Sequence, residues 1–67
     1  ISRKGFMFKR NDIVYHKQLK IIGWVYKAPT RNTSDCVIID LEKEMQGINT
    51  KINVKEYDLE LQCNGEG

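Results

Sequence analysis

The sequence predicts an all-β fold, a small antiparallel barrel of five short strands. The chain has 67 residues, which is enough for one domain only. It contains several short runs of β-branched and aromatic residues separated by turn formers. No stretch shows sustained helical periodicity. Because a domain of this size buries only about 60% of the surface of its unfolded chain, a deep active-site cleft is not expected.

Five segments have the composition of β-strands. They are residues 12–16, 21–27, 36–41, 50–54 and the last part of 54–61. The run 36–41 is almost continuously apolar, so we expect it at the centre of the sheet. Gly23 interrupts the second segment and indicates a bulge or a close backbone approach, which would help a small barrel to curl. In 50–54, Ile52 and Val54 point one way and Lys51 and Asn53 the other, as in a half-buried strand.

The connections between these strands are predicted to be turns and loops. They cover residues 10–12, 17–20, 28–35 and 42–47. We expect a charged turn rather than a helix in the last of them, because it is short and ends at Gly47. A tight helical turn precedes the closing strand. The prediction is therefore an SH3-like barrel over residues 10–62, with a basic arm at 1–9 and a tail at 63–67.

Charge is distributed unevenly along the chain, although the net charge is only +2. Eight basic residues precede residue 34, together with the single acid Asp12: Arg3, Lys4, Lys9, Arg10, Lys17, Lys20, Lys27 and Arg31. Residues 34–67 contain three Lys and eight acids. We expect an electrically polar molecule whose basic surface steers an acidic partner, either a protein or a phosphate backbone. The alternative is that the two halves interleave in the barrel and cancel.

The sequence offers no recognisable catalytic machinery, so we expect a protein that is not an enzyme and binds no cofactor. It has one His, and it lacks the glycine-rich phosphate-binding motifs. Cys36 and Cys63 form no CxxC pair, and His16 cannot complete a zinc site with them. We expect both cysteines to be thiols in a reducing compartment, and a disulfide between them is the alternative. No apolar run approaches the ~18 residues of a membrane span. Ile1 is not an initiator Met, so we expect a processed or trimmed chain.

Two aromatic residues share one face of the second predicted strand. If Trp24 and Tyr26 point inward, they are part of the core. If they point outward, they form an aromatic platform beside Lys20 and Lys27 that is suited to stacking a base or a partner's side chain. His16 is either a surface residue at a strand end or part of a basic docking patch.

Several motifs resemble photosystem I reaction-centre subunit IV, the PsaE family. Residues 36–43 are similar to the family's apolar strand, and Gly47-Ile48-Asn49-Thr50 matches the loop that follows it. The segment Arg10-Asn11-Asp12-Ile13-Val14 resembles the family's opening motif. The resemblance covers about residues 10–61.

This resemblance implies a non-catalytic, peripheral subunit on the stromal side of the plastid thylakoid membrane. Such a subunit binds no cofactor, stabilises neighbouring photosystem I subunits and helps the acidic carrier ferredoxin or flavodoxin to dock. The residues expected to carry the docking charge are Arg10, His16, Lys17, Lys20 and Lys27. A carrier must leave after each electron, so steering matters more than tight binding.

A second resemblance points to nucleic-acid-associated Tudor-like barrels. The stretch from Asp12 to Lys17 is similar to their opening D-x-V-x-H-K, and residues 54–60 resemble their closing segment. In that interpretation Lys17, Lys20, Lys27 and Trp24 contact phosphates and bases. The third hypothesis is a purely structural subunit of another large assembly.

Overall fold

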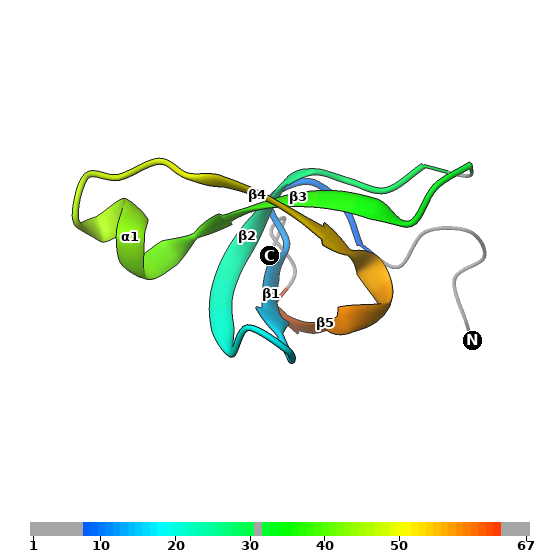
Figure 1. Ribbon diagram of the computed structural model, residues 1–67, viewed down its shortest axis with the longest axis horizontal. Coiled ribbons are helices and arrows are strands. Elements are labelled where there is room, and N and C mark those ends of the chain that lie inside the picture. The colour runs from blue at the N-terminus through cyan, green and yellow to red at the C-terminus, as the bar shows by residue number, and fades with distance from the viewer. Residues whose placement is uncertain (1–7, 31, 64–67) are drawn as a thin grey trace.

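The chain folds into five antiparallel strands, as the sequence predicts. The computed structural model describes residues 8–30 and 32–63. The elements are β1 (Ile13–His16), β2 (Ile21–Lys27), β3 (Asp35–Asp40), α1 (Leu41–Met45), β4 (Lys51–Lys55), η1 (Glu56–Asp58) and β5 (Leu59–Cys63). The strand order is β4-β3-β2-β1-β5, and every neighbouring pair is antiparallel. Figure 1 shows the strands curling around one another into a small barrel-like fold.

The core lies on the inner face of this sheet. Val14, Val25 and Ile38 are completely buried, and each comes from a different strand. The other members of the core cluster are Phe8, Cys36, Val54 and Leu59. Burying one such aliphatic side chain contributes about 1.5–3 kcal/mol. The five strands thus contribute alternate residues to one apolar interior, as the period of two along a strand requires.

The predicted basic arm lies largely outside the described residues, which begin at Phe8. Phe8 itself packs in the core cluster. The Lys9 backbone N–H donates to the carboxylate of buried Asp12 over 2.9 Å. The last residues assigned to the arm therefore belong to the barrel, and at the other end β5 runs to Cys63, one residue beyond the predicted boundary.

Gly23 is a point of close backbone approach, one of the two alternatives that the sequence left open. A Cβ built at this position would lie 2.4 Å from the carbonyl oxygen of Ile39 on the neighbouring strand. No side chain fits in that space. The irregularity in the β2–β3 pairing lies further along, between Val25 and Lys27, where β2 carries one residue more than β3. A bulge of this kind bends the strand. Strand β2 therefore approaches β3 closely at Gly23 and bends between Val25 and Lys27.

The segment after β3 is a short helix, and our expectation of a plain turn at 42–47 was wrong. The buried Asp40 is the N-cap, and its Oδ1 accepts from the N–H groups of Glu42 (2.9 Å) and Lys43 (3.3 Å). At the other end Gly47 has φ +85°. The Gly47 N–H donates to the Glu44 carbonyl and the Ile48 N–H to the Lys43 carbonyl, both over 2.9 Å. This is a Schellman cap, so capping groups at both ends stabilise a helix of five residues.

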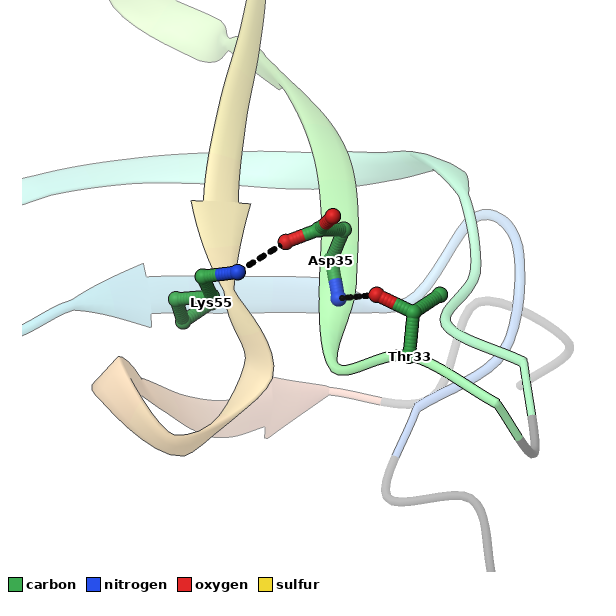
Figure 2. A network of polar contacts seen from close by, with 3 residues as sticks. All are labelled: Thr33, Asp35 and Lys55. Carbon is green, nitrogen blue, oxygen red and sulfur yellow. Dashed lines mark hydrogen bonds and ion pairs between the residues drawn. The ribbon is translucent and has the colours of Figure 1, made fainter.

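The loop before β3 is fixed to β4 by a small polar network. Asp35 and Lys55 are direct cross-strand partners, and their side chains form an ion pair (Figure 2). The Thr33 hydroxyl accepts from the Asp35 N–H over 3.0 Å. The hydrogen bond that the Lys55 ammonium donates to the Asp35 carboxylate is the main reason why the pKa of Asp35 is lowered, and the same bond raises the pKa of Lys55. Because both side chains are exposed, solvent screens the pair and it contributes little to stability.

The predicted helical turn before the last strand is confirmed as η1, which links β4 to β5. At the end of η1, the Lys17 N–H donates to the Asp58 carbonyl over 2.9 Å. Within the described part of the chain, no helix has the length and apolar character needed to cross a bilayer.

A candidate partner-binding face

Two aromatic rings and several cations gather on the outer face of the sheet. The rings of Trp24 and Tyr26 meet edge to face, with centroids 6.0 Å apart and an interplanar angle of 62°. Lys51 Nζ lies 4.7 Å from the centroid of the Tyr26 ring, and Arg10 Cζ lies 5.5 Å from it. We refer to Arg10, Trp24, Tyr26, Lys27 and Lys51 as the aromatic–basic face.

Strand register brings Lys51 to this face. Trp24 on β2 pairs with Ile39 on β3, and Ile39 pairs with Lys51 on β4. Directly paired residues of antiparallel strands point to the same side of a sheet. Lys51 and Trp24 therefore lie in one row across three strands, although 27 positions separate them in the sequence.

Arg10 reaches the face from the segment that precedes β1. The Asn11 N–H donates to the Val25 carbonyl over 2.8 Å, and the Val25 N–H donates to the Asp12 carbonyl over 2.9 Å. Asn11 has φ 77°, a left-handed conformation that Asn tolerates better than most residues. These bonds hold the turn against β2, and the guanidinium extends over the Tyr26 ring.

The bulge in β2 adds Lys27 to the face. Without it, Tyr26 and Lys27 would point to opposite sides of the sheet. Lys27 pairs with Val37, which is the neighbour of inward-pointing Ile38 and so faces outward. Tyr26 is the extra residue of the bulge, and its ring lies beside Trp24 on the same outer side. One irregularity thus places an aromatic ring and a cation next to each other.

Trp24 faces outward and is half-buried, which settles its orientation. Its indole Nε1–H donates to Glu44 Oε1 over 3.0 Å. Glu44 lies on α1, which packs against β2 and β3. The hydrogen bond fixes the indole plane and leaves one carboxylate at the edge of the aromatic–basic face.

The residues predicted to carry docking charge do not form one surface. Arg10 and Lys27 lie at the aromatic–basic face. Lys17 and Lys20 are exposed in the β1–β2 turn, at the opposite end of that hairpin. Lys20 adopts φ 59° there, and its N–H donates to the His16 carbonyl over 2.7 Å.

His16 corrects the prediction of a surface histidine. It is only 5% exposed, and its Nδ1 accepts from the Leu19 N–H over 2.9 Å. The side chain points inward because His16 occupies an inner position of β1, two residues after core residue Val14. The imidazole therefore shapes the β1–β2 turn and takes no part in a surface patch.

The loop formed by residues 47–50 lies beyond the strands. Gly47, Ile48, Asn49 and Thr50 are all exposed, and with α1 they extend at one end of the molecule (Figure 1). Gly47 and Ile48 make the C-terminal cap of α1 described above. Gly47 and Ile48 therefore have a local structural role in ending the helix.

The cysteines lie apart. Cys36 is buried and Cys63 is exposed, and no disulfide joins them. Burial raises the pKa of Cys36 to about 11, and the nearby Glu56 carboxylate adds to the rise. A thiol with so high a pKa is a poor nucleophile. Among the described residues, no three His, Cys, Asp or Glu side chains are grouped so that they could hold a metal ion.

Sequence reasoning missed Lys51 as a site residue. Its outward direction follows from the alternation in 50–54, but its neighbours depend on the pairing of three strands.

Comparisons with protein-family models, curated proteins and solved structures found no match to this chain.

Proposed function

We propose that this chain is a non-catalytic docking module that binds an acidic partner on its aromatic–basic face. The observation that carries the proposal is the position of two cations, Arg10 and Lys51, within cation–π distance of one ring, Tyr26. An exposed cation–π contact stabilises the position of the cation over the ring by about 0.5–1 kcal/mol. The Tyr26 ring therefore favours conformations of both side chains in which the cation lies beside it. The cations are thus prepositioned for an anionic group.

The surroundings of these cations also support the proposal. Arg10, Lys27 and Lys51 are exposed, and the Glu44 carboxylate at the edge of the face bonds to Trp24 and to none of these cations. None of the ion pairs found among the described residues involves these three cations. Their charge is therefore available to a partner, and it would raise the association rate in a salt-dependent way.

The photosystem I interpretation is the alternative form of this proposal. Of the five residues expected to carry its docking charge, it centres on Lys17 and Lys20 in the first loop, with Arg10 nearby, and it takes ferredoxin or flavodoxin as the partner. The two lysines lie at the other end of the β1–β2 hairpin from the aromatic–basic face. The two interpretations share Arg10 and Lys27, and they differ in whether Lys51 or the turn lysines Lys17 and Lys20 contribute the remaining charge.

One experiment separates them, using two double variants that remove equal charge. Arg10→Gln with Lys51→Gln alters the aromatic–basic face, and Lys17→Gln with Lys20→Gln alters the turn. Binding to heparin, a soluble polyanion, is measured at low salt by titration calorimetry. We expect the first variant to weaken binding by about tenfold and the second by far less, because only clustered cations act together.

The same variants are then tested for association with ferredoxin. A rate that falls more in the Lys17/Lys20 variant than in the Arg10/Lys51 variant would support the photosystem interpretation. Equal losses in both variants, for heparin and ferredoxin alike, would show that general charge and no particular face attracts acidic partners, and would contradict the proposal.

A further inference from the structure

We infer that the acidic partner is a single-stranded nucleic acid whose bases stack on Tyr26 and Trp24. This inference rests on the proposed function and names the partner. A single strand carries flat bases beside anionic phosphates, and the face carries two neighbouring rings with two cations over one of them. Aromatic stacking of bases together with cation–phosphate contact is the usual way in which small barrels hold a single strand.

The two rings favour a nucleic acid over an acidic protein. Trp24 and Tyr26 are both partly exposed on the outer side of β2, where the core does not need them. An acidic protein surface offers carboxylates, which use the cations and leave the rings without a partner. A duplex keeps its base faces inside the stack, so only an unpaired strand can use rings and cations together.

The distances allow a base and its phosphate to bind side by side. Lys51 Nζ at 4.7 Å and Arg10 Cζ at 5.5 Å from the Tyr26 centroid are the ends of long, flexible side chains. A base that stacks on Tyr26 displaces a cation from the ring, and the cation remains within reach of the adjoining phosphate. The second ring, 6.0 Å away, is placed for a neighbouring base.

Glu44 gives the face a polarity. Its carboxylate accepts from the indole N–H, so negative charge lies at the α1 side of Trp24. Arg10 and Lys51 flank Tyr26. The Glu44 carboxylate therefore repels a phosphate near Trp24, and the two cations attract a phosphate near Tyr26. The Glu44→Gln variant keeps an acceptor for the indole N–H but removes the charge, and we expect it to tighten binding a few-fold at low salt.

The test compares oligo(dT) of about eight nucleotides with an abasic strand of equal length, which has the same phosphates but no bases. Quenching of Trp24 fluorescence reports stacking directly, because Trp24 is the only tryptophan of the chain. We expect oligo(dT) to quench the emission and to bind at least about tenfold more tightly than the abasic strand.

Two tyrosine variants provide a matched pair. Tyr26→Ala removes a ring of the face, and Tyr57→Ala removes an exposed ring of η1 that is not part of the face. Loss of one stacking partner is expected to weaken oligo(dT) binding by about 5-fold to 150-fold. Tyr57→Ala is expected to change it less than twofold. Tyr26→Ala should weaken binding of the abasic strand far less than binding of oligo(dT), because the abasic strand offers no base to stack.

The outcomes separate this inference from the proposed function. If the abasic strand binds as tightly as oligo(dT), stacking is refuted while polyanion docking stands. If ferredoxin binds and neither strand does, the partner is an acidic protein and the inference is overturned. If heparin, both strands and ferredoxin all fail to bind the folded chain, the proposed function fails as well.

Discussion

At the scale of single residues, the positions of Gly23 and His16 in paired strands determine what surrounds each of them. Gly23 has no room for a Cβ because the Ile39 carbonyl oxygen occupies that place. His16 is buried because it is an inner residue of β1, although its chemistry permits a surface role. The sequence could identify both residues as unusual. It could not identify their neighbours, since these depend on strand register, and a shift of one residue exchanges the two faces.

The Gly23→Ala variant tests the close approach of β2 and β3. Its Cβ would lie 2.4 Å from a backbone oxygen, so the strands would have to move apart. We expect the free energy of unfolding, measured by urea denaturation, to fall by about 3 kcal/mol.

The control is Gly47→Ala, where no atom beyond the adjoining residues lies within 4 Å of the added Cβ and only the positive φ opposes the change. There we expect a loss of about 1 kcal/mol. If Gly23→Ala proved the milder of the two substitutions, the β2–β3 pairing described here would be wrong.

At the scale of elements, the strands were predictable and the helix was not. Four predicted strands lie within one residue of those observed, and the fifth ends two residues later than predicted, because β-branched runs bounded by turn formers are a strong local signal. Helix α1 has five residues, too few to show a period of 3.6. Its signal was present at the ends instead, in Asp40 as N-cap and Gly47 as C-terminal glycine.

The Asp40→Ala variant tests whether capping maintains α1. It removes the acceptor of two backbone N–H groups at a buried position, so we expect a loss of about 1–2 kcal/mol in urea denaturation. Trp24 emission should also change, because Glu44 on α1 bonds the indole.

Asp40→Asn is the matched control, since its amide oxygen can accept the same hydrogen bonds. We expect it to retain most of the stability. An Asp40→Ala protein with unchanged stability and unchanged emission would show that the cap does not hold the helix.

At the scale of the whole molecule, strand order rearranges the charge that the sequence separates. The chain is basic in its first half and acidic in its second. Yet Lys51 comes from the acidic half and joins Arg10 and Lys27, because β4 and β2 flank β3. The prediction of a basic docking surface therefore named two members of the face and missed Lys51. Residue counts per half-chain cannot show which cations meet across a sheet.

The central claim is that the outer face of β2, with Arg10 and Lys51, is where the partner binds. The most direct measurement is the map of amide chemical-shift changes when oligo(dT) is added to the isotope-labelled chain. We predict the largest changes at Arg10, Trp24–Lys27 and Lys51, with little change at the β1–β2 turn. Changes centred on Lys17–Lys20, or spread evenly over the barrel, would contradict the claim.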